Sequence, residues 1–274
     1  MKSASAGARA LEIHVESLRK SFGAVSVLQG VNLSVGRGEM IAIVGGSGCG
    51  KTVLLEQMIG QMRPDQGRVL LADHESPDSP LVDLSQLDTV GLDRLRTHWA
   101  VVFQRNGLLS GTVEENISLP LELVKGMNES EIRERVRRAL ETVGLNPDEV
   151  LSLTRDELSG GMAKCVAIAR AWAMDPLLIF FDEPTTGLDP QRAKLIQDLI
   201  FKMYLEEQDG FRRTVLIITH DKDLLSRLQP RIVMVHDGKV FFDNSYLLFQ
   251  QSDSTIIRPY FEYMPILNGA GRSQ

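Results

Sequence analysis

Eight consecutive residues, GGSGCGKT at Gly45 to Thr52, match the phosphate-binding pattern G-x-x-x-x-G-K-[ST]. Glycines let the backbone curl so that its N–H groups and a following helix N-terminus point into one concavity, which suits a phosphate. We expect Lys51 to reach the β- and γ-phosphates of a nucleotide and the Thr52 hydroxyl to bind Mg²⁺. Further phosphate contacts are expected from the rest of this phosphate loop, namely Gly45, Gly46, Ser47, Gly48, Cys49 and Gly50.

A second candidate group is the acidic pair Asp182 and Glu183, which follows the apolar run LLIFF at 177–181. Two carboxylates at the mouth of a buried strand are costly unless cations or solvent meet them. We expect Asp182 to coordinate Mg²⁺, commonly through water, and Glu183 to polarise the water that attacks a γ-phosphate. The alternative is an exposed strand end with two solvated acids, and the presence of a phosphate loop favours the catalytic interpretation.

The elements around these residues have the required pattern. Residues 40–45, MIAIVG, are continuously apolar and indicate a strand buried on both faces, while residues 52–62 carry apolar side chains at helical spacing. The phosphate loop therefore connects a strand to a helix. Further strands at 177–181 and 214–218, with helices at 129–143 and 162–174, predict a largely parallel α/β core.

Alternating apolar residues at 11–17 and 31–35 predict antiparallel strands in the first 40 residues. Residues 73–93 are rich in Asp, Ser and Pro and predict a surface loop leading into a short helix near 92–98. The segment 104–156 is helical without buried strands, so we expect it to form a smaller lobe.

Length, charge and cysteine content exclude several classes of protein. The chain has 274 residues, a formal net charge of −6 and two cysteines. This length allows one large domain or a core with an inserted lobe. A mild acidic balance argues against a protein that wraps nucleic acid, and two cysteines cannot form a disulfide framework. The strongest apolar runs are far shorter than the ~20 residues that span a bilayer, so another chain is expected to supply any membrane span.

The segment LSGGM, Leu158 to Met162, lies just before a predicted helix and upstream of the acidic pair. With the phosphate loop, it resembles the signature, usually LSGGQ, of the ATP-binding subunits of ABC transporters, and the resemblance extends from about Leu11 to Val240. Ser159, Gly160 and Gly161 would open a helix whose N–H groups form a second phosphate site.

The resemblance assigns further residues. Phe22 corresponds to the aromatic residue that stacks on adenine, and Gln104 to the glutamine that senses Mg²⁺ and the γ-phosphate. Asp189 lies in the loop after the catalytic acid, and His220 corresponds to the switch histidine. Without these companions, Phe22 would more often be a core aromatic and His220 a capping or core residue.

The family implies a P-loop NTPase (RecA-like) core with an antiparallel β subdomain and an inserted α-helical subdomain, the ABC ATPase fold. We assign the ATPase domain to residues 11–245, its helical subdomain to about 104–165 and a C-terminal tail to 246–274. The resemblance implies a head-to-tail dimer that sandwiches ATP between one copy's phosphate loop and the other's LSGGM. It also implies transmembrane permease partners, possible substrate-binding and regulatory subunits, and a cytoplasmic location on the inner face of the membrane.

Met162 and the following AK, together with FQRNGLLSGTVEENISLPL at 103–121, are similar to the Mla or Mce type, which transports phospholipid. The main alternative is an ABC transporter for amino acids, metal chelates or drugs. A non-transport ABC ATPase acting on DNA or ribosomes fits less well, since such chains generally carry two ATPase units or a coiled-coil insertion. A P-loop kinase or GTPase would lack LSGGM and the downstream histidine.

Two further features carry expectations. Cys165 stands where the family usually has Arg, which removes a cation near the composite site, and the neighbouring Lys164 is a candidate replacement. Leu108 and Leu109 lie among small polar residues, so we expect both to be exposed and to dock a permease helix. The alternative is that both leucines fold back onto the small lobe.

Overall fold

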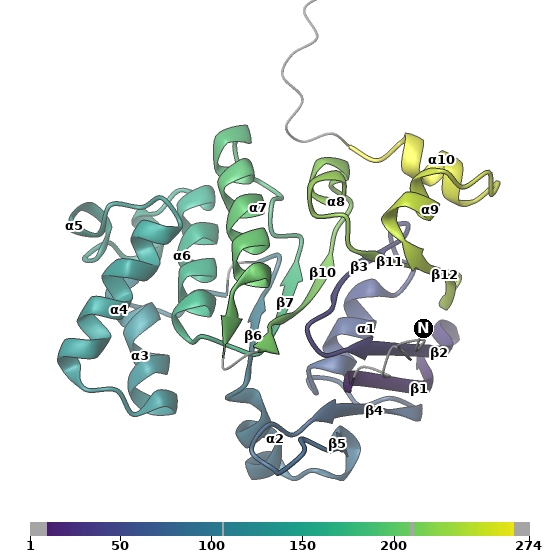
Figure 1. The fold of residues 1–274 in the computed structure, drawn as a ribbon, viewed down its shortest axis with the longest axis horizontal. Coiled ribbons are helices and arrows are strands. Elements are labelled where there is room, and N and C mark those ends of the chain that lie inside the picture. Colours follow the sequence, from purple (N-terminus) through teal and green to yellow (C-terminus); the bar gives the residue numbers. More distant parts are fainter. Residues whose placement is uncertain (1–9, 106, 209–210, 266–274) are drawn as a thin grey trace, which may run out of the picture.

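The computed structural model describes residues 10–105, 107–208 and 211–265. Its main feature is a six-stranded sheet in the order β12-β11-β3-β10-β7-β6, accompanied by a four-stranded sheet in the order β2-β1-β4-β5 (Figure 1). The strands are β1 (Leu11–Phe22), β2 (Val25–Gly36), β3 (Met40–Val44), β4 (Gln66–Ala72), β5 (Leu81–Asp83), β6 (Trp99–Val102), β7 (Leu178–Asp182), β8 (Glu207–Gln208), β9 (Phe211–Arg212), β10 (Thr214–Ile218), β11 (Arg231–His236) and β12 (Lys239–Ser245). The helices are α1 (Lys51–Met58), α2 (Thr89–Arg96), α3 (Val113–Lys125), α4 (Glu129–Thr142), α5 (Pro147–Val150), α6 (Gly160–Ala173), α7 (Pro190–Leu205), α8 (Lys222–Leu228), α9 (Tyr246–Gln250) and α10 (Ile257–Glu262).

The central sheet explains why distant motifs meet. Strand β10 pairs in parallel with β3 on one side and β7 on the other, and β6 pairs in parallel with β7. The carboxyl ends of these four strands therefore lie at one edge, where ligands bind in open α/β sheets. The phosphate loop follows β3 and His220 follows β10. Asp182 ends β7 with Glu183 directly after it, and Gln104 follows β6.

Both faces of the central sheet are covered, which is why its strands read as continuous apolar runs. In β7, Ile179 and Phe181 pack into the cluster with α3, α4, α6 and α7. Leu178 and Phe180 belong to the cluster on the other face, with α1 and the four-stranded sheet. The predicted α/β core with an antiparallel β unit is confirmed.

The helical lobe, at the left of Figure 1, contains α3, α4 and α5 packed beside α6. Local sequence sets its helix starts, since Thr112 with Glu115 and Asn128 with Glu131 each form a capping box. Helix α4 buries Val136, Ala139 and Leu140 on one face, as the amphipathic pattern predicts. The lobe shares one hydrophobic cluster with the central sheet.

The segment after β12 is more ordered than the term tail implies. Helices α9 and α10, yellow in Figure 1, bury Tyr246, Phe249, Ile257 and Phe261 against apolar residues of β3, β11 and α8. Neither helix was predicted. The region 73–93, predicted as a loop, also holds the short strand β5, a single 3₁₀ turn and the start of α2. Within the described ranges, no helix is both long and apolar enough to cross a bilayer.

Candidate functional site

Two glycines of the phosphate loop, Gly45 and Gly50, could not be replaced without rearrangement. Gly45 has φ +149°, and a Cβ there would lie 2.3 Å from the carbonyl oxygen of Val235. Gly50 caps α1 with φ +103°, and its Cβ would lie 2.8 Å from the side chain of Leu28. The loop is thereby pressed against neighbouring strands, and its exposed residues Gly46, Ser47 and Gly48 face outward.

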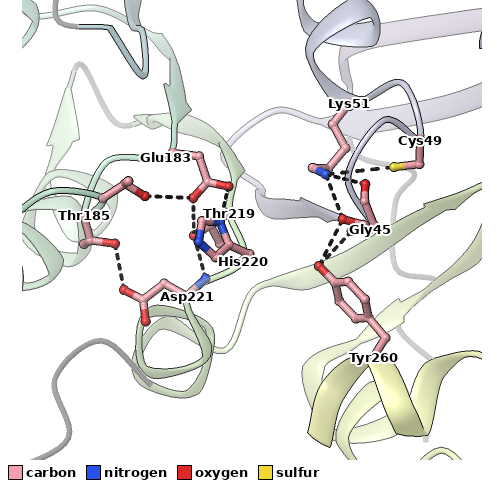
Figure 2. A network of polar contacts seen from close by, with 11 residues as sticks. Gly45, Cys49, Lys51, Glu183, Thr185, Thr219, His220, Asp221 and Tyr260 are labelled. Atoms are coloured by element: carbon pink, nitrogen blue, oxygen red, sulfur yellow. Dashed lines mark hydrogen bonds and ion pairs between the residues drawn. The ribbon is translucent and has the colours of Figure 1, made fainter. Parts of the chain in front are cut away.

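Lys51 lies over this loop. Its ammonium donates hydrogen bonds to the carbonyl oxygens of Gly45 (2.7 Å) and Gly46 (3.0 Å), and it lies 3.9 Å from the Sγ of Cys49 (Figure 2). Thr52 is exposed in the first turn of α1. Lys51 and Thr52, the predicted cation and hydroxyl, therefore both lie in the first turn of α1, where the loop meets the helix.

Across the sheet edge, Glu183 forms the centre of a second polar group (Figure 2). Its side chain is buried, and its Oε1 lies 2.6 Å from Nδ1 of His220. Its Oε2 accepts hydrogen bonds from Thr186 (3.3 Å) and Thr219 (3.4 Å). Glu183 has φ +49°, a strained conformation for a residue with a Cβ, and such strain concentrates at functional sites. The structure thus brings together the predicted base and the predicted switch histidine.

Residues that sequence reasoning did not select hold this pair in place. Asp221 is fully buried and accepts a hydrogen bond of 2.7 Å from Thr185. The Asp221 side chain also caps α8, and the backbone N–H of Asp221 donates to the hydroxyl of Thr219. His220 is therefore flanked by two anchored neighbours. The sequence does carry a signal for Asp221, since an Asp directly before a helix is a strong N-cap pattern.

Asp182 fits the predicted metal site. The carboxylate is buried at the end of β7, and burial together with the charge of Glu183 raises its pKa above the ordinary value, against the charge of Lys164. The backbone N–H of Gln104 hydrogen-bonds to the same carboxylate. The Asp182 carboxylate, the Thr52 hydroxyl and the side-chain amide oxygen of Gln104 are oxygen donors of the kind that Mg²⁺ prefers. These residues would hold the ion.

The loop that carries Gln104 is anchored by the helix that follows LSGGM. Lys164 is buried on α6, and its ammonium donates to the carbonyl oxygens of Phe103 and Gln104, each at 3.0 Å. Arg170 on the same helix donates to the carbonyl of Gly107 at 3.1 Å. Burial lowers the pKa of Lys164 to about 8, although Asp182 and Glu183 oppose that shift.

The signature residues lie in the helical part of the molecule. Ser159 is exposed and caps α6, with its Oγ accepting the N–H of Met162 at 3.2 Å. Gly160 is exposed, and Gly161 lies beside Arg192 of α7, whose guanidinium would be 3.1 Å from a Cβ at that glycine. Asp189 is exposed and caps α7.

Phe22 lies at the end of β1 and is 48% exposed, and the Lys20 ammonium lies 5.8 Å from the centroid of its ring. It pairs across the hairpin with Val25, which lines a groove together with Cys49, His236 and Phe241. This groove runs beside Gly46, Ser47 and Gly48 of the phosphate loop, and Phe22 is not among its lining residues.

Two expectations are wrong. Leu108 is only 6% exposed and packs into the cluster of the helical lobe, whereas Leu109 is 46% exposed as predicted. Lys164 cannot replace the missing arginine, because its ammonium points at the Gln104 loop inside the molecule. Cys165 is itself fully buried, and burial raises its pKa to about 11. The arginine position thus faces the core in this chain.

Comparisons with known proteins agree on the family. Residues 28–186 match the family model described as ABC transporter. The histidine transport ATP-binding protein HisP of Pseudomonas aeruginosa is 35% identical over 232 residues, which cover 83% of this chain and 88% of that protein. The methionine import ATP-binding protein MetN 4 of Oceanobacillus iheyensis is 34% identical over 233 residues, with the same share of this chain and 63% of that protein. The chain thus spans less than two thirds of the length of that methionine import relative.

A solved structure shows the same fold. The ATP-binding cassette MJ0796, a dimer in a post-hydrolysis state bound to ADP and Pi, superposes with a TM-score of 0.74 at 30% identity. The match covers 85% of this chain and 98% of that one. The architecture is therefore the ABC ATPase fold, and the chain belongs to the ABC transporter family of ATP-binding proteins.

Proposed function

We propose that this chain binds and hydrolyses ATP as the ATP-binding subunit of an ABC transporter. One observation carries the proposal. Glu183 and His220, 2.6 Å apart, follow two neighbouring strands, and the phosphate loop follows the next strand along the same edge. A base that is oriented by a second residue and faces a phosphate site is the arrangement that hydrolysis of a γ-phosphate requires.

Each residue then has a role. Lys51 exchanges its loop carbonyls for the β- and γ-phosphates, and the loop N–H groups stabilise the negative charge. Glu183 orients water and accepts its proton as the oxygen attacks the γ-phosphorus and the bond to ADP breaks. His220 holds the carboxylate in that orientation. Mg²⁺, when bound, neutralises the charge that develops on the phosphate oxygens.

A second copy of the chain completes the site in this proposal. Ser159 and Gly160 are exposed at the start of α6, apart from the chain's own phosphate loop at the end of β3. The N-terminus of a helix suits the phosphates of a nucleotide held by another copy. The related cassette MJ0796 is described as dimeric. Transmembrane permease subunits would hold the dimer at the cytoplasmic face of the membrane, with substrate-binding or regulatory subunits as further partners.

For the transported substrate, the relatives favour amino acids. HisP is named for histidine transport and MetN 4 for methionine import. The phospholipid assignment made from the sequence finds no support in these names. It remains a second candidate because of Met162, which replaces the usual glutamine of the signature. The alternative stated from the sequence was an ABC transporter for amino acids, metal chelates or drugs, and we propose amino acids, moved by import, as the first substrate class to test.

The test is purification of the native complex, followed by identification of its proteins and bound small molecules by mass spectrometry. ATP hydrolysis by the reconstituted complex is then measured with methionine, histidine or phospholipid supplied. Stimulation by an amino acid supports import, whereas co-purified phospholipid with no amino-acid response supports the second candidate. A complex that contains no permease would contradict the transporter role.

A further inference from the structure

The C-terminal helix α10 reaches the phosphate loop through one side chain. The hydroxyl of Tyr260 accepts a hydrogen bond from the N–H of Gly45 at 3.0 Å and donates one to the carbonyl oxygen of the same residue at 3.3 Å (Figure 2). These residues are 215 positions apart in the chain. A single hydroxyl thus pairs with both polar groups of the first glycine of the loop.

This contact provides hydrogen-bond partners for the backbone N–H and carbonyl of Gly45, which lie beyond the end of the strand pairing. Gly45 is buried, and the parallel pairing of β3 with β10 and β11 ends before it, at Ile43 and Val44. Buried backbone groups must find partners, and the space around Gly45 admits no side chain of its own. Without the hydroxyl, the N–H of Gly45 would lose the acceptor that it has in the structure.

The same carbonyl also binds Lys51. The oxygen of Gly45 accepts the Lys51 ammonium at 2.7 Å, in addition to the Tyr260 hydroxyl. When Lys51 turns toward a phosphate, this oxygen gives up its charged donor. Tyr260 then remains as its partner, which reduces the cost of releasing the lysine. The tyrosine is therefore placed to stabilise the loop both before and after nucleotide binding.

Tyr260 is itself held by the core of the C-terminal segment. Its ring packs against the apolar cluster of α9 and α10, with its centroid 6.5 Å from that of Phe249. Burial raises the pKa of its hydroxyl to about 12, still further above neutral pH than the ordinary value, and the protonated hydroxyl can donate. The position of the hydroxyl is thus set by packing.

Helix α10 and the residues directly after it also contact the segment that follows His220. The N–H of Lys222, two residues after His220, donates to the carbonyl of Pro265, three residues after the end of α10, at 3.2 Å. The Lys222 ammonium lies 4.1 Å above the ring of Phe261. The helix therefore contacts the phosphate loop and the segment that follows the switch histidine.

We propose that Tyr260 is a positioning residue of the nucleotide site, and that α9 and α10 brace the phosphate loop against the segment after His220. This inference rests on the proposed function, because it assigns the brace to the loop that binds ATP. The loop is held in its phosphate-binding shape by a tertiary contact in addition to its own glycines.

Two variants and a built-in reporter test the brace. Tyr260→Phe keeps the ring and removes only the hydroxyl, and Tyr263→Phe removes the hydroxyl of a residue that is 86% exposed in the same segment. The reporter is Cys49 within the loop, which is partly exposed, while the other cysteine, Cys165, is fully buried. The rate at which N-ethylmaleimide alkylates Cys49, followed by mass spectrometry, measures how accessible the loop is at that residue.

We expect Tyr260→Phe to raise the alkylation rate of Cys49 several-fold and to weaken ATP binding by about tenfold, as befits one lost buried hydrogen bond. Tyr263→Phe should match the wild type in both. A purely structural role would lower the melting temperature but leave the alkylation rate and the affinity for ATP, measured well below that temperature, unchanged. That result would overturn the proposal.

Hydrogen exchange on the wild-type chain gives an independent reading that needs no variant. The N–H of Gly45 should be protected like the amides of β3, and fast exchange there would also overturn the proposal. A wild-type chain that fails to bind ATP would instead contradict the proposed function. In that case the Cys49 and Gly45 measurements still decide whether Tyr260 orders the loop.

Discussion

The ammonium of Lys164 lies 3.0 Å from the carbonyl oxygen of Gln104. Lys164 is on α6, the helix that Ser159 caps, and Gln104 follows β6 at the edge of the central sheet. The helix that presents the signature residues is thus fixed to the loop that is expected to sense the γ-phosphate. A shift of α6 would be transmitted to Gln104 through this bond.

Lys164→Met should lower the rate of ATP hydrolysis while leaving ATP binding nearly intact. Methionine keeps the length of the side chain but cannot donate to the two carbonyls, so the Gln104 loop loses its anchor. Hydrogen bonds to a charged group contribute about 1.5 to 3 kcal/mol, which corresponds to roughly ten- to a hundredfold in rate. Phosphate release and nucleotide affinity are the measurements. Lys202→Met, at a lysine that is 69% exposed on α7, is the control and should not change either.

The low pKa of Lys164 predicts two opposite pH effects. Above pH 8 its ammonium loses its positive charge, which weakens both hydrogen bonds to the loop, so hydrolysis should fall with an apparent pKa near 8. The unfolded chain holds this proton up to its ordinary pKa of 10.5, so it binds more protons than the folded chain between about 8 and 10.5. The contribution of Lys164 to the free energy of unfolding should therefore increase over that range. Both trends, measured against Lys164→Met, should be absent from the variant, and equal profiles for the two chains would contradict the assignment.

The adjacent leucines of the Gln104 loop should respond differently to the same change. Leu108→Asp places a charge in the cluster of the helical lobe and should destabilise the fold by about 3 kcal/mol or more. Leu109→Asp alters an exposed residue and should leave thermal melting and ATP binding unchanged. If Leu109 docks a permease, this second variant should also lose the permease in a pull-down. Normal assembly and transport by Leu109→Asp would exclude Leu109 from the docking surface.

These leucines show where sequence reasoning stops. Both lie among Gly, Ser and Thr, and nothing in the sequence distinguishes them. The structure does, because Asn116 of α3 binds the N–H and the carbonyl of Leu109 and thereby orients the loop. Which of two neighbouring side chains turns inward depends on this tertiary contact.

The central strands could be predicted because burial on both faces leaves a continuous apolar run, as in β3, β7 and β10. Helix α10 could not. It has six residues, IRPYFE, with a proline inside and no amphipathic repeat long enough to recognise. Its order comes from packing against β3 and β11. Tyr260 was missed for the same reason, since its partner Gly45 is distant in the sequence.

Lys51→Ala should weaken ATP binding and abolish hydrolysis. In the structure Lys51 is the cation that contacts the phosphate-loop carbonyls, and its removal leaves the phosphates without that charge. Calorimetric titration with ATP measures the affinity, and phosphate release measures turnover. The melting temperature without nucleotide should stay close to the wild-type value, because the side chain is partly exposed. Wild-type turnover in this variant would disprove the assignment of the phosphate loop.

The most direct test of the account is a paired measurement on Glu183→Gln in the transporter complex. The amide keeps the shape of the side chain but cannot accept the proton of the attacking water. We expect this variant to bind ATP at least as tightly as the wild type, to release phosphate at least a hundredfold more slowly, and to accumulate the nucleotide-bound dimer. Phosphate release at the wild-type rate, with no retained ATP, would contradict the claim that Glu183 is the base of an ATPase.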